Sequence, residues 1–412
     1  MRKMKGGVTT ARGFKASGVY AGIRHKKKDI ALVYSETDCV AAGTFTTNLV
    51  KAAPVFWCKD ILKNGIPKHG MIFNSGIANA CMGEQGKKDN YEFAETVAAE
   101  LKIAPESLFV GSTGVIGQPM PMNVIKKAVP ELVAALGDDE AAALNATEAI
   151  MTTDTVPKQC AASFMIEDEE IEIFVGGMSK GSGMIHPNMA TMLSVVTTDV
   201  NIDEKLLQEA VSKVVSETFN MISVDRDTST NDTFIVLANG AAGNEKIVKK
   251  NKDYDNFETA LMVVCKDLAK QMAADGEGAT RMIECKVRNA KTKEDAVKLS
   301  KSVVSSSLVK AMVFGADANC GRIMCALGYA GAEFDPDHVD IFLETEIDGD
   351  EKKLQLIADG VPTAYDEEKA SDMLSQKEVT IKVDVKAGYE KATAWGCDLT
   401  YDYVKINGDY RS

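Results

Sequence analysis

Histidine is scarce in this 412-residue chain, which contains four, and the nine cysteines form no Cys-x-x-Cys pair. Structural zinc sites use such residues in closely spaced pairs, so the sequence argues against a zinc site. Scattered cysteines in odd number likewise give no sign of a disulfide framework. A Ser-His-Asp triad would have to use His186 or His338, and nothing in the sequence selects either. We therefore expect no metal and no resident cofactor.

A surplus of positive charge is also lacking. The chain has 47 Lys and Arg against 60 Asp and Glu, a formal net charge of -13. Nucleic-acid binders usually present a basic face, so we expect no nucleic-acid partner. No stretch approaches the roughly 18 consecutive apolar residues of a membrane span, and the first residues lack the apolar run of a signal peptide. We expect no membrane association and a cytoplasmic location.

Two common catalytic motifs are absent: His-Glu-x-x-His and the Gly-x4-Gly-Lys-Ser/Thr phosphate loop. Four clusters instead combine glycine with serine, threonine or asparagine, and a fifth, residues 225–233, is rich in serine, threonine, asparagine and aspartate without glycine. Glycine lets a backbone approach a ligand closely, and small hydroxyl or amide side chains add hydrogen-bonding groups without bulk. We interpret the clusters as a polar binding cleft in which hydroxyl chemistry is favoured over histidine chemistry. They span residues 74–80, 111–117, 180–193, 225–233 and 275–280.

The length suggests two or three domains, and the predicted elements mix strands with helices. Because the strands do not alternate strictly with the helices, the pattern favours a layered α+β arrangement over a doubly wound sheet. We expect residues 167–170 to form a hairpin loop and the glycine-rich stretch 176–188 to separate two strands. Strands are predicted at 30–34, 71–74, 171–175, 234–238, 339–343 and 379–385. Helices are predicted at 91–101, 123–136, 203–219, 257–272 and 294–312.

Over almost its whole length the sequence resembles the ornithine acetyltransferase (glutamate N-acetyltransferase) family of arginine biosynthesis. The central motif is KGSGMIHPNMATML at residues 180–193. Further motifs occur in the same order as in the family. As a set they are specific to it, although each motif alone would be weak evidence. They are VTTARGF (8–14), AAGTFTTN (41–48), STGVIG (112–117), MTTDTVPK (151–158), STNDT (229–233) and WGCDLTYDYVKIN (395–407).

The resemblance implies a precursor that cleaves its own Ala190–Thr191 bond. A threonine hydroxyl can attack the preceding carbonyl, and water then hydrolyses the resulting ester. The products would be an α chain, residues 1–190, and a β chain, residues 191–412, that assemble as a heterotetramer of two α and two β chains. The implied fold is a layered αββα sandwich of the self-processing threonine acyltransferase kind.

The resemblance also implies site residues. Thr191 is the expected nucleophile, and its freed α-amine, with a reference pKa of about 7.7–8.0, can accept the proton without a histidine. N-acetylornithine would donate its acetyl group to Thr191, and glutamate would collect it in a ping-pong exchange. Thr113 and Gly114 match the oxyanion hole. The expected substrate-binding residues are Thr153, Thr155, Lys180, Thr191, Glu277, Asn407 and Ser412.

Other functions stay open at this point. A related self-cleaving amidohydrolase or aminopeptidase would use the same nucleophile but pass the acyl group to water, and a non-catalytic protein could keep the cleft. Use of acetyl-CoA as a second acetyl donor is not decided by the sequence. His186 is expected to be structural. The chain departs from the family pattern at Ile77, Met82, Arg226, Ala318, Cys320, Gly408 and Ser412.

Overall fold

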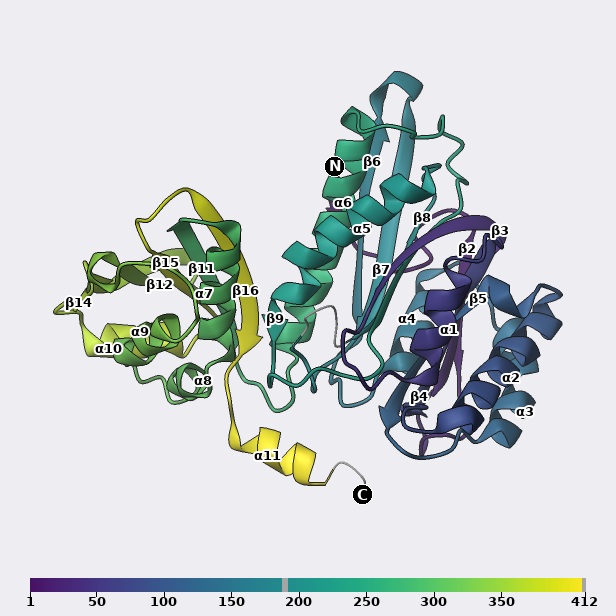
Figure 1. Ribbon diagram of the computed structural model, residues 1–412, viewed down its shortest axis with the longest axis horizontal. Coiled ribbons are helices and arrows are strands. Elements are labelled where there is room, and N and C mark those ends of the chain that lie inside the picture. The colour runs from purple at the N-terminus through teal and green to yellow at the C-terminus, as the bar shows by residue number, and fades with distance from the viewer. Residues whose placement is uncertain (187–191, 410–412) are drawn as a thin grey trace. The chain divides into compact units, whose positions relative to one another are not determined.

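The computed structural model describes residues 1–186 and 192–409, and it divides into two compact units (Figure 1). Unit 1 comprises residues 1–181, 188–219 and 228–268. Unit 2 comprises residues 182–187, 220–227 and 269–412. Each unit has its own sheet that combines parallel and antiparallel strand pairs, so the protein is mixed α/β.

Unit 1 contains a nine-stranded sheet in the order β1-β6-β7-β8-β10-β3-β4-β5, with β2 paired to β3. β8 and β10 run parallel to each other in its middle, and every residue of both strands is buried. Such continuous burial accounts for their unbroken apolar and Thr/Ser composition. The strands are β1 (Arg2–Met4), β2 (Phe14–Val19), β3 (Ile30–Phe45), β4 (Lys68–Ile77), β5 (Leu108–Val115), β6 (Lys158–Ile166), β7 (Ile171–Lys180), β8 (Leu193–Thr198) and β10 (Thr233–Ala238).

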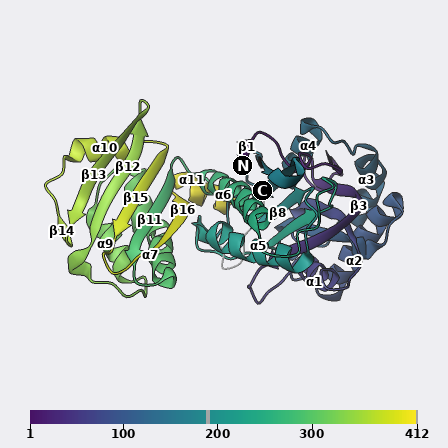
Figure 2. The same ribbon diagram turned by 90° about the horizontal axis from the view of Figure 1, so that it is seen from above.

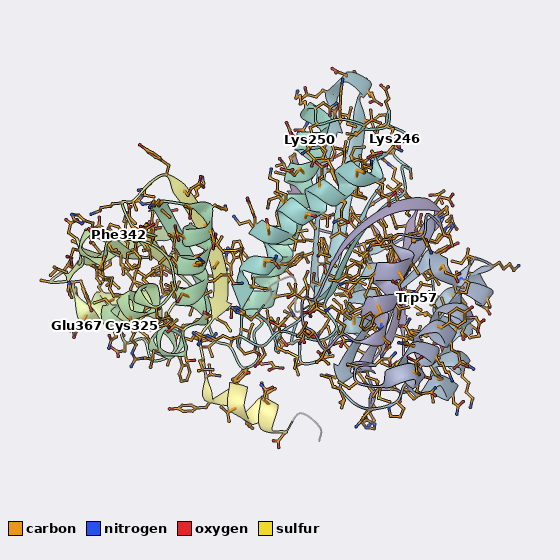
Figure 3. All side chains as sticks on the ribbon, viewed as in Figure 1. Trp57, Lys246, Lys250, Cys325, Phe342 and Glu367 are labelled. Atoms are coloured by element: carbon orange, nitrogen blue, oxygen red, sulfur yellow. The ribbon has the colours of Figure 1, made fainter. Side chains whose placement is uncertain are left out.

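The helices of unit 1 pack apolar faces on this sheet. Asp203 caps α5 by accepting a hydrogen bond from the Lys205 N–H. Six apolar residues at helical spacing along α5 are all buried: Leu206, Leu207, Ala210, Val211, Val214 and Val215. Trp57, labelled in Figure 3, lies on α1 and donates from Nε1 to the Leu108 carbonyl at 3.0 Å. The helices are α1 (Ala53–Ile61), α2 (Gly83–Leu101), α3 (Met122–Ala134), α4 (Glu140–Ile150) and α5 (Glu204–Glu217); α6 (Lys252–Ala274) contributes residues to both units.

Unit 2 contains a seven-stranded sheet in the order β14-β13-β12-β15-β11-β16-β9, most of which is visible side by side in Figure 2. Its strands are β9 (Ile222–Ser223), β11 (Met282–Ala290), β12 (Asp340–Ile347), β13 (Asp350–Ala358), β14 (Val361–Pro362), β15 (Glu378–Asp384) and β16 (Glu390–Cys397). Its helices are α7 (Lys293–Ser305), α8 (Ser307–Phe314), α9 (Cys320–Gly328), α10 (Glu367–Leu374) and α11 (Tyr401–Gly408).

The predicted elements are all present, with two corrections. The predicted helix 294–312 is two helices, because Ser306 ends α7 and its hydroxyl caps α8 by accepting from the Val309 N–H. The glycine-rich stretch does not begin as a loop, since residues 176–180 belong to β7 and pair with β6 and β8. The hairpin between β6 and β7 turns at residues 167–170, as expected.

Within the described part of the chain, no helix combines the length and the apolar character that crossing a membrane requires.

Candidate active site

The five polar clusters of the sequence gather in two places, one in each unit. In unit 1, Asn231 donates from Nδ2 to the carbonyl oxygens of Ala78 (2.5 Å) and Ser112 (2.8 Å). This side chain therefore ties together the clusters at 74–80, 111–117 and 225–233. In unit 2, the Glu277 N–H donates to the Ser182 carbonyl at 2.8 Å, which joins the clusters at 180–193 and 275–280.

Thr113 and Gly114 lie near the end of β5, where its backbone approaches β4 unusually closely. Gly114 has φ +130°, and a Cβ atom built there would stand 2.1 Å from the carbonyl carbon of Gly76. No other residue type fits at 114 without moving a strand. The register also shifts here, since Ile77 pairs with both Thr113 and Val115. The irregularity leaves Thr113 and Gly114 half-buried.

Lys180 ends β7 and reaches Thr113. Its Nζ lies 3.3 Å from the Thr113 Oγ1, and the residue is buried. In the antiparallel register of β7 and β8, Lys180 pairs with Leu193, the first residue of β8. The ammonium of Lys180 therefore lies where β5 and β7 end and β8 begins.

Asp154 lies beside this lysine in the loop before β6. Its Oδ1 accepts from Lys158 Nζ at 2.6 Å and from the Gly181 N–H at 2.7 Å, and its Oδ2 accepts from the Thr152 N–H at 2.9 Å. Burial alone would raise the pKa of Asp154, but attraction to Lys180 and Lys158 and these hydrogen bonds lower it to about 2. Asp154 is therefore an anion at any working pH.

A second acid of unit 1, Asp232, has the opposite character. Burial raises its pKa well above the usual value, although hydrogen bonds from the Met192 N–H, Ser229 and Thr46 and attraction to Lys180 oppose the rise. Its Oδ2 makes no hydrogen bond in the structure. The pKa of Asp232 is therefore shifted in the direction opposite to that of Asp154, with burial as the cause.

The group in unit 2 is built around Glu277. This glutamate is buried, and its Oε2 accepts from Asn407 Nδ2 of α11 at 2.7 Å. Gly183 leaves room for the carboxylate, because a Cβ at that position would lie 2.2 Å from it. Two residues expected to bind substrate, Glu277 and Asn407, are thus in direct contact with each other.

Asp225 fixes the chain just before the segment that the structure does not describe. Its carboxylate accepts from the N–H groups of Met184 (2.6 Å) and Ile185 (2.8 Å). His186 Nδ1 lies 2.9 Å from Ser223 Oγ, and burial, with repulsion from Lys301 and Arg226, lowers its pKa to about 4. The imidazole is neutral at neutral pH, which fits the structural role expected for it.

The remaining predicted residues fall into two classes. Thr153 is half-buried and Thr155 is exposed, on either side of Asp154 in the loop before β6. Ala190, Thr191 and Ser412 lie outside the described residues.

Several departures from the family pattern have a defined place. Arg226 has φ +70°, a backbone region that favours glycine, so the departure there carries a conformational cost. Ile77 lies at the bulge of β4 and is buried, and Met82 precedes α2. Ala318 and Cys320 lie at the start of α9, and Gly408 ends α11.

Sequence reasoning missed Asp154, Lys158 and Asp232. A signal for the first two was present. Asp154 and Lys158 are four residues apart, but Pro157 between them excludes an ion pair on a helix surface. Lys158 also directly precedes a mostly apolar run that forms a strand. Asp232 had a weaker signal, because an acid directly before the apolar run of β10 is easily taken for a loop residue.

Comparison with known proteins gives the same family for nearly the whole chain. The model of the ArgJ family matches residues 15–412. A protein of Symbiobacterium thermophilum named arginine biosynthesis bifunctional protein ArgJ is 51% identical over 415 residues, covering 100% of both chains. The protein of that name in Bacillus subtilis is 44% identical, covering 100% of this chain and 98% of its own. The crystal structure of ornithine acetyltransferase from Mycobacterium tuberculosis, complexed with ornithine, is 42% identical with a TM-score of 0.43, covering 46% of this chain and 99% of its own.

Proposed function

The chain belongs to the ArgJ family of bifunctional acetyltransferases of arginine biosynthesis, and from this premise we propose that it moves the acetyl group of N-acetylornithine to glutamate through an acetyl ester of Thr191. The observation that carries the proposal is the contact of Lys180 Nζ with Thr113 Oγ1 at 3.3 Å. It joins a cation suited to an amino-acid carboxylate to a hydroxyl suited to an oxyanion.

The first step of the proposal is maturation of the chain. Thr191 Oγ attacks the Ala190 carbonyl carbon, the C–N bond breaks, and the nitrogen takes the proton that the hydroxyl gives up. Water then hydrolyses the ester to release the Ala190 carboxylate and a Thr191 with both a hydroxyl and an α-amine. The chains 1–190 and 191–412 remain together in a layered αββα unit, and two copies form the heterotetramer. This division is covalent and differs from the two compact units of the fold.

The transfer itself has two halves. Thr191 Oγ, deprotonated by its own amine, attacks the acetyl carbonyl of N-acetylornithine, the amide C–N bond breaks, and ornithine leaves with the proton. The amine of glutamate then attacks the acetyl ester, which restores the threonine hydroxyl. The Thr113 hydroxyl and the Gly114 N–H stabilise each tetrahedral oxyanion, and one such donor contributes about 3–4 kcal/mol.

The substrate contacts follow from charge. Lys180 binds the α-carboxylate that N-acetylornithine and glutamate share, and Thr153 and Thr155 supply polar contacts beside it. Glu277 binds the cationic side chain of ornithine, and Asn407, whose Nδ2 already holds the Glu277 carboxylate at 2.7 Å, keeps that group oriented. Ser412 completes the substrate contacts from the C-terminal tail. Acetyl-CoA serves as the acetyl donor in the second activity, in the same acetyl pocket.

Denaturing mass measurement of purified protein tests maturation. We expect two fragments that meet at Ala190/Thr191. Thr191→Ala removes the hydroxyl and leaves a single full-length chain, whereas Thr191→Ser keeps a hydroxyl on Cβ and still cleaves. A single full-length chain from active unsubstituted protein contradicts the proposed maturation.

A labelled acetyl group separates transfer from the competing hydrolase. With N-acetyl-labelled ornithine, the label should appear on glutamate, and free acetate should form much more slowly. Release of acetate at the same rate with and without glutamate indicates the self-cleaving amidohydrolase or aminopeptidase instead. Labelled acetyl-CoA with glutamate as acceptor tests the second activity in the same assay.

A further inference from the structure

The loop between β2 and β3, residues 20–29, is organised around one buried carboxylate. Asp29 is fully shielded from solvent, and its two oxygens accept from the four consecutive N–H groups of residues 21–24 at 2.6 to 3.1 Å. The carbonyl of Asp29 also accepts from the Ser75 N–H of β4 at 2.8 Å. Hydrogen bonds to a carboxylate are stronger than those between neutral groups, so Asp29 fixes the course of residues 21–24 beside β4.

Arg24, the last residue of this run, holds the loop that follows α4. Its guanidinium donates from Nη1 to the Met151 carbonyl and from Nη2 to the Thr152 carbonyl, the latter at 3.1 Å. The next residue of that loop is Thr153, the first of the two threonines expected to bind substrate. A guanidinium suits this contact, because its donors lie in a fixed plane and its charge strengthens each hydrogen bond.

Arg24 also lies beside the bulge of β4 on which the oxyanion residues rest. A Cβ atom built at Gly76 would stand 3.0 Å from Arg24 Cγ, so the arginine stem lies next to Gly76. Gly76 is in turn the residue that Gly114 approaches, with 2.1 Å between a Cβ built at Gly114 and the Gly76 carbonyl carbon. One side chain therefore lies between the expected oxyanion pair and the loop that carries the two threonines.

We propose that Arg24 and Asp29 are positioning residues for substrate binding: Asp29 shapes the β2–β3 loop so that the Arg24 guanidinium holds the loop 151–157 in register with the oxyanion pair. This inference rests on the proposed function, because it assumes that Thr153 and Thr155 contact the substrate. It adds two residues that touch no substrate and act through the backbone of another loop.

The loop 151–157 depends on outside contacts for its position. It connects α4 to β6 and contains no helix or strand of its own. A misplacement of about 1 Å can cost about a hundredfold in rate, so fixing two successive carbonyls matters for the groups beside them. The proposed cleavage at Ala190–Thr191 uses no bound ornithine or glutamate, and we therefore expect it not to need this contact.

A purely structural role for Arg24 makes a different prediction. If its hydrogen bonds only stabilise the fold, their loss lowers the amount of active enzyme and reduces kcat calculated per total protein. KM of the remaining folded enzyme then stays constant, because KM does not depend on the enzyme concentration. A rise in KM with cleavage unchanged therefore distinguishes positioning of the substrate loop from stabilisation of the fold.

The experiment measures kcat and KM for N-acetylornithine at saturating glutamate, together with the extent of cleavage. Arg24→Met removes the guanidinium and keeps the unbranched stem. We expect KM to rise about tenfold, the value of one charge-assisted hydrogen bond, with kcat within about threefold and cleavage complete. Lys28→Met is the matched control, because Lys28 lies in the same loop but donates to two side chains of α4 at 2.6 and 2.8 Å. Its KM should stay within about twofold of the unsubstituted enzyme.

Asp29 is tested alone and in combination with Arg24. Asp29→Asn keeps one acceptor oxygen for four N–H groups, and KM should rise as it does in Arg24→Met. In the double variant KM should exceed that of Arg24→Met by less than about twofold, because the two residues act on the same contacts and their effects are not additive.

Three results overturn the inference: an unchanged KM in Arg24→Met, an equal rise in Lys28→Met, or effects that multiply in the double variant. If Arg24→Met does not fold, Arg24→Lys, which keeps the charge but only one donor nitrogen, decides by the same criterion. Failure of the proposed function is distinguishable, because the unsubstituted enzyme would then transfer no acetyl group from N-acetylornithine.

Discussion

Asp154 and Asp232 are both buried in unit 1, and both are attracted to Lys180, yet the pKa values of their carboxyl groups are shifted in opposite directions. Asp154 accepts from Lys158 Nζ and from two backbone N–H groups, and its pKa is lowered to about 2. Among the described residues, Asp232 accepts from the Met192 N–H and from the hydroxyls of Ser229 and Thr46, and its Oδ2 has no hydrogen-bond partner. The pKa of Asp232 is raised well above the usual value.

The difference shows that burial does not decide whether an acid is charged. Desolvation is the largest influence on both groups and acts in the same direction. At Asp154, attraction to Lys180 and Lys158 together with the hydrogen bonds outweighs desolvation and lowers the pKa, whereas at Asp232 desolvation outweighs the opposing influences and the pKa rises. Lys180 therefore has one neighbouring acid whose pKa is lowered and one whose pKa is raised.

The largest expected effect comes from removing the cation that distinguishes the two aspartates. Lys158→Met leaves Asp154 without its bonded counter-ion, and we expect the free energy of unfolding of unit 1 to fall by about 3–5 kcal/mol. Urea unfolding monitored on unit 1 measures it. Lys87→Met, which breaks the exposed pair with Glu84 in the same unit, is the matched control and should change the value by less than about 1 kcal/mol. Equal effects of the two substitutions would mean that the buried pair contributes no more to stability than the exposed pair.

Regular elements were predictable from the sequence, and this contrast between acids was not. The prediction of a helix at α5 was correct because apolar residues at helical spacing are a local pattern that the sequence shows directly. The break at Ser306 was missed because serine caps a helix only if the chain turns there, and the apolar pattern continues on both sides.

The site was predictable only in part and only through family motifs. Thr113, Gly114 and Lys180 were expected together, and Lys180 Nζ does contact Thr113 Oγ1. The partners of Asp154 and Asp232 depend on which strands become neighbours, here β5, β7, β8 and β10, and strand order is not encoded in local spacing. Charged residues in a sequence are usually on the surface, so burial of these acids could not be inferred.

The two aspartates should change the free energy of unfolding in opposite directions as the pH rises. The folded-state pKa of Asp154 lies below its usual 3.8, so the carboxylate contributes about 2 kcal/mol above pH 4 that is lost as the pH falls from about 4 to 2. The folded-state pKa of Asp232 lies above 3.8, so its burial costs stability increasingly as the pH rises above about 4, until the folded-state group ionises.

The measurement is the urea midpoint of unit 1 at a series of pH values. Asp154→Asn should reduce the gain in stability between pH 2 and 4, and Asp232→Asn should flatten the decline at higher pH. If both substitutions change the same part of the curve in the same direction, the opposite pKa shifts of the two aspartates are wrong.

The smallest expected effect concerns a neutral partner of Asp232. Ser229→Ala removes a hydroxyl that opposes the rise in the pKa of Asp232 and that also accepts from the Asn231 N–H at 3.1 Å. We expect a loss of about 1 kcal/mol in the free energy of unfolding and a further rise in the pKa of Asp232, which extends the decline in stability to higher pH. The same urea series tests it. In the Asp232→Asn background, Ser229→Ala should still lower stability but should no longer change its pH dependence, because the titrating group is gone. A change in pH dependence that persists in that background would have to arise from another acid, and Asp232 would not be the acid whose pKa burial raises.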